Sequence, residues 1–447
     1  MANSRATIFA PATAVGKAGV AVIRISGPHA GAVLQALCGQ IPAARMATRA
    51  DLRDPETGER LDDGLVLWFP APKSFTGEDV AELHVHGARA VIADLLAVLA
   101  ARPGLRLAKP GEFARRAFDA GKLDLAQVEA LADLIAAETR AQARQALQQL
   151  GGALGAAVEG LRLRILRLRA QAEAEIDFPD EGDVPGGLIA AMAPALIALD
   201  VELGALIGQA TRGERLRNGY TVALLGPPNA GKSSLLNRLA RREAAIVSSM
   251  AGTTRDAIEV HLDLGGWPVT LIDTAGLREL ADDGDGDPQF AIEREGIRRT
   301  QLLAKAADLR VLVFDATAPV IDDALSRFAA EALVVHNKID LAPAGREALG
   351  VSATTGEGLA ELETVLAQKA AAALGEEDGQ ASIVTRARHR EALEDVRAAL
   401  RQARAQTAAE LIAEDLRRAA DALGRIVGRT GVEDVLDLLF AEFCIGK

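Results

Sequence analysis

Cysteine is almost absent from this sequence, which has only Cys38 and Cys444 among its 447 residues. Two cysteines cannot form a disulfide framework, and no cluster of cysteine and histidine has the spacing of metal ligands. Both observations favour a reducing compartment. Aromatic residues are also scarce, at 3%, whereas alanine, leucine and arginine are plentiful, so we expect much of the chain to be helical.

Long hydrophobic runs are missing as well. The stretch from Val184 to Leu199, the longest without a charged residue, contains two prolines and two glycines. It is shorter than the roughly 18 residues that a membrane span needs. Near the N-terminus, Lys17 and Arg24 interrupt the apolar stretches, so the h-region of a signal peptide is not formed. These absences predict a cytoplasmic protein with no membrane partner.

The sequence also lacks an excess of basic residues. The chain has 50 lysines and arginines against 62 aspartates and glutamates, which gives a formal charge of -12. No global field attracts such a protein to nucleic acid or to an anionic membrane, so any contact with nucleic acid has to be local. Arg386, Arg388 and Arg390 are candidates for a phosphate contact, although solvated helix faces account for them more simply.

The character of the sequence changes along the chain, whose length suggests about three domains. The first 120 or so residues mix β-like and helical stretches, as α/β and α+β domains do. Sequence typical of helices covers 123–217, with a loop at 177–187, and resumes at 385. Between these parts, residues 220–351 alternate strands and helices, as parallel sheets do. We predict one helical domain with another domain inserted into it, because two separate helical domains would struggle to cover their apolar faces. The expected N-terminal elements are strands at Val20–Ile25, Gly64–Phe69 and Val80–Val85 and a helix at Ala88–Ala101.

A nucleotide-binding loop stands out in the stretch YTVALLGPPNAGKSSLLNRLA. A strand of the buried type is followed by a turn from Gly226 to Ser233 and then by an amphipathic helix, which is the context that a P-loop requires. The glycines let backbone N–H groups close around phosphates. Lys232 reaches the β- and γ-phosphate oxygens, and Ser233 offers its hydroxyl to Mg²⁺. A chance glycine-rich turn would not bring this strand and helix with it.

Four further motifs follow in chain order. Gly252-Thr253-Thr254 has the position of a switch loop, whose second threonine would give another hydroxyl to Mg²⁺. Asp273-Thr274-Ala275-Gly276 follows the strand PVTLI, which places its aspartate near the metal. Asn337-Lys338-Ile339-Asp340 ends the strand LVVH, and its carboxylate can accept two hydrogen bonds that guanine offers and adenine does not. Ser352-Ala353-Thr354 follows another short strand. Five motifs in this order indicate GTP.

One residue of the Ras-type pattern is missing. Small GTPases of that type place a glutamine after the DTAG glycine to orient the attacking water, whereas this chain has Leu277. Leucine cannot orient water, so either hydrolysis is very slow or another group contributes. Asn229, inside the P-loop, could hold a monovalent cation whose charge stabilises the transition state. A loop asparagine with only local hydrogen bonds explains this residue equally well.

The chain also contains a set of sequences that occur together in one family. They include PNAGKSSLLN, AIVSSMAGTTRD, LIDTAGLRE, IEREGIRR, FTGEDVAELHVHG, KPGEFARRAF, KLDLAQVEA, IDFPDE and the final FCIGK. Together they resemble the tRNA modification GTPase family MnmE, also called TrmE, over essentially the whole chain. The resemblance implies a multidomain fold. An α+β tetrahydrofolate-binding and dimerisation domain (1–120) precedes a discontinuous helical domain (121–215 and 381–447), into which an α/β P-loop GTPase domain of the Ras type (216–380) is inserted.

The resemblance also implies an activity. With the FAD-dependent partner MnmG (GidA), in a heterotetramer or larger complex, the family installs an aminomethyl-type or carboxymethylaminomethyl-type group on C5 of the wobble uridine of certain tRNAs. A 5-formyl or 5,10-methylene tetrahydrofolate is the one-carbon donor. Members are homodimers whose GTP hydrolysis uses Mg²⁺ and K⁺ and is activated by dimerisation of the G domains.

Residue roles at the nucleotide follow from the resemblance position by position. The potassium site is matched by Asn229, Ser248, Met250 and Thr253, and the Mg²⁺ ligands by Ser233 and Thr254. Glu293 matches the glutamate that positions the catalytic water, although without the family it would be taken for a solvated helix charge. The residues expected around GTP are Asn229, Ala230, Gly231, Lys232, Ser233, Ser234, Ser248, Ser249, Met250, Ala251, Gly252, Thr253, Thr254, Asp273, Thr274, Ala275, Gly276, Asn337, Lys338, Asp340, Ser352, Ala353 and Thr354.

A folate site is the second site that the resemblance implies. Its positions are matched by Arg24, Glu82, Lys122 and Lys447. Arg24 and Lys122 are suitable partners for the carboxylates of a folate, and Glu82 for the N–H donors of its pterin ring. Apart from the family, each of these residues would pass as an ordinary surface charge.

The tail FCIGK admits three interpretations. A prenylation signal is excluded, because the glycine and lysine that end this chain do not fit the last two positions of such a signal. A buried structural cysteine and a functional cysteine remain. By the resemblance, the tail lies beside the folate and Cys444 is a catalytic residue, as Asn229 and Glu293 are at the nucleotide.

Two departures from the family pattern and one rival function complete the interpretation. Pro227 follows the first P-loop glycine, and the acidic stretch DDGDGDP lengthens the segment before Glu293.

The rival function is that of a ribosome-assembly or regulatory GTPase whose G domain only switches a binding surface. PNAGKSSLLN cannot separate the two functions, but residues 1–120 and the tail can, because a pure switch needs no folate site.

Overall fold

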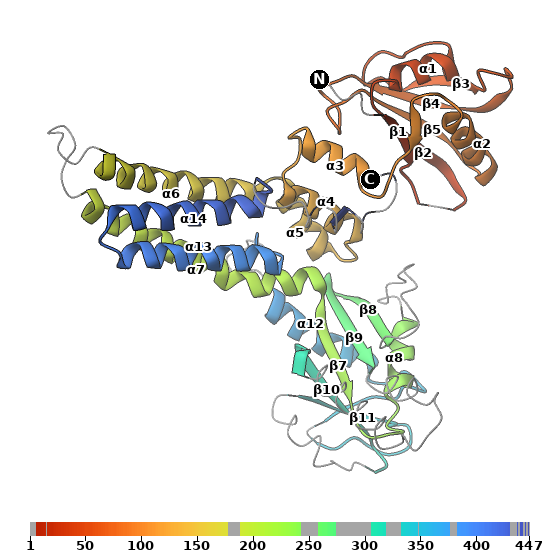
Figure 1. The fold of residues 1–447 in the computed structure, drawn as a ribbon. Coiled ribbons are helices and arrows are strands. Elements are labelled where there is room, and N and C mark those ends of the chain that lie inside the picture. Colours follow the sequence, from red (N-terminus) through yellow and green to blue (C-terminus); the bar gives the residue numbers. More distant parts are fainter. Residues whose placement is uncertain are drawn as a thin grey trace, which may run out of the picture. The chain divides into compact units, whose positions relative to one another are not determined.

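A computed structural model describes residues 6–14, 16–177, 188–242, 258–273, 305–318, 332–346, 348–375, 382–429, 436, 439–440, 443 and 446. The chain divides into two compact units, which Figure 1 shows in the colours of the sequence. The first unit combines Met1–Ala132, Leu150–Gly186 and Thr407–Lys447, and the second combines Asp133–Gln149 and Gly187–Gln406. Both units therefore draw on segments that are distant in the sequence.

A mixed six-stranded sheet, in the order β3-β4-β5-β2-β1-β6, forms the centre of the first unit. Its strands are β1 (Thr7–Pro11), β2 (Ala18–Ser26), β3 (Thr48–Arg53), β4 (Arg60–Phe69), β5 (Val80–Gly87) and β6 (Leu105–Leu107). Neighbouring strands are antiparallel, except that β1 and β6 are parallel. The structure confirms the three strands expected in this region, each slightly longer, and adds the other three.

Different layers cover the two faces of this sheet. Helices α1 (Ala30–Cys38) and α2 (Arg89–Ala100) cover one face, where β5 buries the alternate residues Ala81, Leu83 and Val85. Because side chains alternate along a strand, Glu82 and His84 of β5 belong to the opposite face. On that face Phe113 of α3 (Glu112–Asp119) packs against Ile8 of β1. The alternation therefore gathers polar side chains on the face that α3 partly covers.

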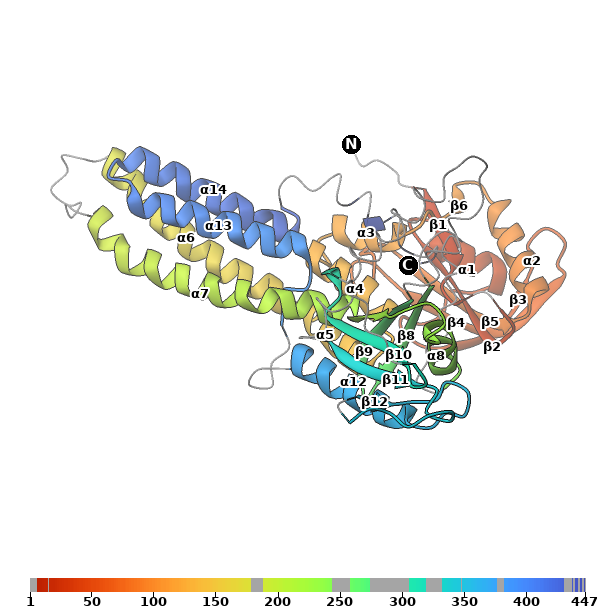
Figure 2. The same ribbon diagram turned by 90° about the horizontal axis from the view of Figure 1, so that it is seen from below.

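Long helices and the C-terminal segment complete the first unit. Helices α6 (Ala153–Asp177) and α14 (Ala409–Val427) lie side by side (Figures 1 and 2). Arg429, just beyond α14, pairs with Glu159 near the start of α6 at 2.9 Å, so the two helices run antiparallel. The residues that pack against α3 and α4 (Leu125–Ala136) are Leu436, Leu439, Phe440 and Phe443. These contacts attach the C-terminal segment to the first unit.

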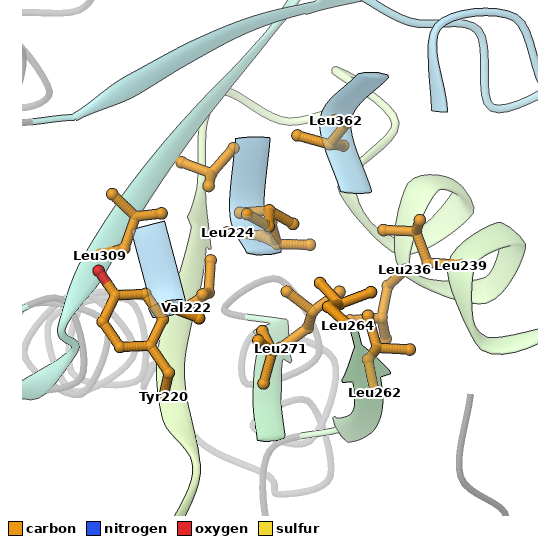
Figure 3. Close-up of a cluster of buried hydrophobic side chains, with 14 of the residues drawn as sticks. Tyr220, Val222, Leu224, Leu236, Leu239, Leu262, Leu264, Leu271, Leu309 and Leu362 are labelled. Atoms are coloured by element: carbon orange, nitrogen blue, oxygen red, sulfur yellow. The ribbon is translucent and has the colours of Figure 1, made fainter. Parts of the chain in front are cut away.

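The second unit contains another six-stranded sheet, in the order β12-β11-β10-β7-β9-β8. Its strands are β7 (Tyr220–Leu225), β8 (Ile258–Leu264), β9 (Trp267–Asp273), β10 (Leu309–Asp315), β11 (Leu333–Asn337) and β12 (Leu349–Gly350). Only the pair of β8 and β9 is antiparallel. In Figure 3, Val222 and Leu224 lie among leucines of the neighbouring strands and of α8 (Lys232–Ala240) and α12 (Leu359–Leu374). The largely parallel sheet expected over 220–351 is confirmed, and α8 is the helix described in that range, whereas 274–304 and 319–331 lie outside the described residues.

Three more of the described helices belong to the second unit: α5 (Arg140–Leu150), α7 (Leu188–Asn218) and α13 (Ala387–Ala405). Helix α7 continues past the domain boundary predicted at 215 and is followed directly by β7. Two helical residues, Ala141 of α5 and Leu216 of α7, are buried in the same apolar cluster as the sheet. The core of the sheet therefore includes residues from helices outside the segment 220–351, and the predicted boundary itself remains a prediction.

Among the described helices, α7 is long and apolar enough between Ile189 and Asn218 to cross a membrane, on length and composition alone. The sequence criterion of an uncharged run was stricter, because such a run ends at Asp200. In the structure Asp200 pairs with Arg397 at 2.8 Å and with Arg401 at 2.9 Å, both on α13. Charged groups within a membrane span are costly, so this helix gives weak support for a membrane protein.

A buried arginine joins α3 to the rest of the first unit. Arg116 is 4% exposed, and its guanidinium donates to Glu78 at 2.8 Å, to Glu112 at 3.1 Å and to the carbonyl of Ala6 at 2.8 Å. Burial alone would raise the pKa of the Glu112 carboxyl, but hydrogen bonds from Arg106, a backbone amide and Arg116 lower it to about 2. The motifs FTGEDV and KPGEFARRAF thus contain residues that hold the fold together.

We expect Arg116→Met to reduce the free energy of unfolding by about 1–3 kcal/mol, because it removes the hydrogen bonds of a buried guanidinium to the partly buried carboxylate of Glu78 and to the carbonyl of Ala6. Denaturant unfolding of the full chain measures this loss. The contribution of Glu112 should be complete above pH 4.5 and be lost as the pH falls towards 2, since its pKa is lowered in the folded state. Arg89→Met, at an exposed position in the first turn of α2, is the control and should change stability by less than about 0.5 kcal/mol. Equal losses for the two variants would contradict a structural role for Arg116.

Candidate functional site

The P-loop connects the end of β7 to the start of α8. Lys232, the first residue of α8, is 7% exposed, and its ammonium donates to the carbonyl oxygens of Gly226 and Pro227 at 3.0 Å each. Asn229 has a left-handed backbone with φ 63° and an exposed side chain. Ser233 is also exposed, in the first turn of α8. The loop thus has its lysine inside and its serine at a helix N-terminus, which is where phosphates bind.

A buried asparagine connects the P-loop to the motifs expected to recognise guanine. Asn337 is 2% exposed; its amide donates to the carbonyl of Ala230 at 2.9 Å, and its oxygen accepts from the amide of Ala353 at 3.0 Å. Gly231, with φ 87°, approaches this side chain so closely that a Cβ would collide with it. Only glycine fits both the backbone conformation and the available space. One side chain therefore fixes the P-loop, NKID and SAT segments relative to one another.

The residues expected to recognise guanine meet at the carboxyl ends of parallel strands. Strands β10, β11 and β12 are parallel neighbours, and NKID follows β11 while SAT follows β12. The hydroxyl of Ser352, a fully buried residue, donates to Asp340 Oδ1 at 2.5 Å. The hydrogen bond fixes the orientation of the carboxylate. A fixed carboxylate can accept the two N–H bonds that distinguish guanine from adenine.

Asp315 is a residue of this edge that the sequence analysis missed. It ends β10 directly opposite Asn337 of β11, and its Oδ2 pairs with the ammonium of Lys338 at 2.6 Å. Hydrogen bonds from Lys338 and from Thr317 lower the pKa of the Asp315 carboxyl to about 2. The available signal was its position, because carboxylates at the carboxyl end of a central parallel strand lie where ligands bind in open α/β sheets.

Much of the expected catalytic machinery falls outside the described residues, namely Ser248, Ser249, Met250, Ala251, Gly252, Thr253, Thr254, Thr274, Ala275, Gly276, Glu293, Cys444 and Lys447. The antiparallel pair of β8 and β9 lies between the two switch motifs: GTT precedes β8 and TAG follows β9. Asp273, the last residue of β9, is fully buried. Within the described residues, no group of three or more His, Cys, Asp or Glu side chains could hold a metal.

A second polar cluster lies on the sheet of the first unit. Arg24 of β2 and Glu82 of β5 are opposite each other in register, and Arg24 donates to Glu82 Oε1 from Nε at 3.0 Å and from Nη2 at 2.9 Å. The other carboxylate oxygen of Glu82 is 3.2 Å from His84 Nε2. The structure therefore brings together two of the residues expected to bind folate, pairs them with each other, and adds His84, which the sequence analysis did not assign to the site.

Two phenylalanines frame the guanidinium of Arg24. Its central carbon lies 5.5 Å from the ring centroid of Phe75 and 5.9 Å from that of Phe113, within the range of cation–π contacts. Phe75 and Gly77 belong to the loop between β4 and β5. Lys122 lies near this loop, since a Cβ placed on Gly77 would be 3.5 Å from Lys122 Cε. Both phenylalanines were missed, although they occur in family motifs of a chain with few aromatic residues.

The described part of the C-terminal tail lies against the same sheet. Gly446 has φ 101° and packs against the backbone of Pro11, where a Cβ would collide with the carbonyl group. Pro11 is opposite Ile23 in the pairing of β1 with β2, one residue from Arg24. The contact brings the tail beside the strand that carries the polar cluster.

The arginines considered for contact with RNA phosphates are engaged within the second unit. Arg386 pairs with Asp133 at 2.7 Å. Arg390 pairs with Glu214 at 2.9 Å and with Glu394 at 3.3 Å. These carboxylates give Arg386 and Arg390 a structural role, which neither a phosphate contact nor a solvated helix face had predicted.

Comparison with known proteins gives consistent matches along the chain. The family described as GTP-binding protein TrmE N-terminus matches residues 7–122, and the MnmE helical domain matches residues 125–444. The tRNA modification GTPase MnmE of Parvibaculum lavamentivorans is 56% identical over 99% of this chain and 100% of that protein. Those of Rhodospirillum rubrum and Paramagnetospirillum magneticum are each 53% identical over 99% of both chains.

Among solved structures, the G domain of the FeoB iron transporter of T. maritima matches 33% of this chain and 98% of its own, with 27% identity and a TM-score of 0.23. A score this low supports no argument about the arrangement of the chain. The full-length sequence matches do support membership of a family, because they include both the segment with the Arg24 cluster and the segment with the P-loop. By these matches, the chain belongs to the tRNA modification GTPase family MnmE.

Proposed function

We propose that this chain couples GTP hydrolysis to modification of C5 of the wobble uridine of certain tRNAs. It is a GTP hydrolase by its family. It acts with the FAD-dependent partner MnmG (GidA), and a 5-formyl or 5,10-methylene tetrahydrofolate supplies one carbon to the aminomethyl-type or carboxymethylaminomethyl-type group. The working form is a cytoplasmic homodimer that joins MnmG in a heterotetramer or larger complex.

The observation that carries this proposal is the polar cluster on the first unit's sheet. A tetrahydrofolate has N–H donors on its pterin ring, carboxylates at its far end and an aromatic ring between them. Glu82 suits the donors, Arg24 suits a carboxylate, and the half-buried ring of Phe75 offers a stacking surface. Gly446 packs one register position from the strand residue Arg24, which favours a tail that takes part in this site.

A ribosome-assembly or regulatory GTPase is the alternative. Its G domain would need the P-loop and guanine-recognition contacts described above, and these are compatible with either function. Such a switch would have no use for a site with donors, acceptors and aromatic rings in a separate unit. The Arg24 cluster therefore favours the tRNA-modifying function.

Cations complete the hydrolytic site in this proposal. When bound, Mg²⁺ and K⁺ supply positive charge to the β- and γ-phosphate oxygens. Ser233 and Thr254 hold Mg²⁺; Asn229, with Ser248, Met250 and Thr253, holds K⁺. The exposed side chain of Asn229, on a left-handed turn of the P-loop, is consistent with such a contact. Dimerisation of the G domains then activates hydrolysis.

The cation assignment predicts that GTP hydrolysis is faster in KCl than in equal NaCl, because the smaller Na⁺ fits the same oxygen ligands poorly. Asn229→Ala should abolish this difference and leave GTP affinity largely intact. Asn237→Ala, at an exposed position of α8, is the matched control and should keep the potassium response. Steady-state hydrolysis in the two salts measures both effects, and equal rates for the wild type would refute the cation site.

The assignment of Glu293 predicts a loss confined to the chemical step. Glu293→Ala should lower kcat by about 10²- to 10⁴-fold with little change in GTP affinity, because a group acting only on the attacking water contributes in the transition state. Glu295→Ala, two residues further along the same motif, is the control and should hydrolyse GTP normally. A Glu293 variant within a few-fold of wild type would remove the residue from the mechanism.

The tail assignment predicts that Cys444→Ser preserves folding, GTP hydrolysis and folate affinity but abolishes or severely reduces tRNA modification. Cys38→Ser is the control. Burial raises the pKa of the Cys38 thiol to about 11, so this thiol stays protonated and unreactive at neutral pH. Deleting Gly446 and Lys447 should weaken folate binding itself. Wild-type levels of modified uridine in the Cys444→Ser strain would return that cysteine to a packing role.

A further inference from the structure

Three glutamines lie on one face of α5, at Gln142, Gln145 and Gln149. Their spacing of three and four residues aligns them along the helix. Gln145 is 4% exposed and Gln149 is 2% exposed, whereas Gln148 between them is exposed. Buried amide groups are retained where they make hydrogen bonds, so the partners of these glutamines indicate what this face of α5 does.

The partners are the two segments through which the chain enters and leaves the nucleotide-binding sheet. On the entry side, at the end of α7, Gln142 donates to the carbonyl of Arg217 at 3.1 Å and Gln145 to that of Gly213 at 3.3 Å. Gln145 also donates to the carbonyl of Ser382, on the exit side, at 3.4 Å. One helix therefore holds both connections by their backbone.

The exit segment, residues 382–386, is held most completely. Gln149 donates to the carbonyl of Ile383 at 3.2 Å and exchanges hydrogen bonds with the hydroxyl of Thr385 at 2.9 and 3.2 Å. This segment crosses α7 at Gly213, where a Cβ would collide with the carbonyl of Val384. The crossing therefore requires a glycine at position 213, and glutamines of α5 make hydrogen bonds to both crossing segments.

A shared carboxylate joins entry and exit a second time. Asp133 Oδ1 accepts from Arg217 Nε at 2.9 Å and from Arg386 Nη2 at 2.7 Å. A cavity of about 110 Å³ lies between these groups and the glutamines and is lined by polar side chains as well as by small alanines. Because Asp133 accepts hydrogen bonds from both Arg217 and Arg386, a shift of the entry segment would also displace the exit segment.

The opposite end of this region contacts the hairpin between the two switch motifs. The amide of Ala141, in the first turn of α5, donates to the carbonyl of Gly266 at 3.3 Å, in the turn between β8 and β9. Glu138 is 3.8 Å from His261 of β8, and Ala141 is buried in the core of the sheet. The other ends of β8 and β9 lead into the switch motifs, so α5 touches the hairpin at the end remote from the nucleotide.

We propose that α5 is a positioning element that transmits the nucleotide state from the hairpin of β8 and β9 to the entry and exit segments, and through them to α7 and α13. Gln145, Gln149 and Thr385 are its positioning residues. The inference rests on the proposed function, which couples GTP hydrolysis to tRNA modification, and adds that bound GDP and GTP affect the hairpin of β8 and β9 differently. Packing alone would not explain the arrangement, since apolar side chains fill buried space without the cost of desolvating amides.

Hydrogen exchange of the full chain, with GDP and with the GTP analogue GMPPNP, tests this transmission. In the wild type, exchange over 138–149 and 382–386 should differ between the two nucleotides. In Gln149→Leu and in the milder Thr385→Val, the difference should persist over 258–273 but disappear from 382–386. Gln148→Leu, the exposed neighbour on the same helix, is the matched control and should behave as the wild type.

A functional readout separates transmission from simple destabilisation. Gln149→Leu and Thr385→Val should reduce modified wobble uridine by about tenfold, within the usual range of coupling between sites, while GTP affinity and potassium-stimulated hydrolysis stay near wild type. A purely structural residue would instead lower thermal stability and nucleotide affinity together.

Two results would overturn the proposal: no nucleotide-dependent exchange over 138–149 in the wild type, or the same dependence over 382–386 in both variants. Protection of the P-loop, residues 226–234, is read in the same experiment. If nucleotide does not protect the P-loop of the wild type, nucleotide binding itself is refuted. This result distinguishes failure of the proposed function from failure of transmission.

Discussion

The nucleotide site depends on the buried side chain of Asn337. Its amide and oxygen hold the carbonyl of Ala230 and the amide of Ala353, so three loops from three parts of the sequence keep one geometry. The sheet supplies the foundation, because parallel strands end at a common edge and deliver these loops together. Removing both hydrogen bonds would leave a buried donor and acceptor unpaired, each at a cost of about 1–3 kcal/mol.

Each of the two units contains one candidate site. The second unit gathers the residues expected to bind phosphate and guanine at one edge of a largely parallel sheet, and α5 contacts both that sheet and the end of α7. The first unit places Arg24 and Glu82 on the polar side of a mixed sheet, near Phe75 and the tail. The candidate nucleotide site and the Arg24 cluster thus lie in different units.

Local features of the sequence predicted much of this structure, and long-range pairings escaped it. A short β-like run identified the strand that became β5, and the glycines and lysine of the P-loop identified the nucleotide site. The pairing of Arg24 with Glu82 and of Asp315 with Lys338 depends on strand order, which no local pattern contains. The α5 glutamines were missed for the same reason, because their partners lie about 70 and 235 residues away and residues 140–150 carry no motif.

The central claim is that this chain modifies tRNA rather than only switching a binding surface. Nucleoside analysis of tRNA from a strain lacking the gene tests it most directly. The account predicts that the C5-modified wobble uridine disappears and returns when the wild-type gene is supplied. Unchanged wobble uridines in the deletion strain would contradict the account and leave the chain as a switch GTPase.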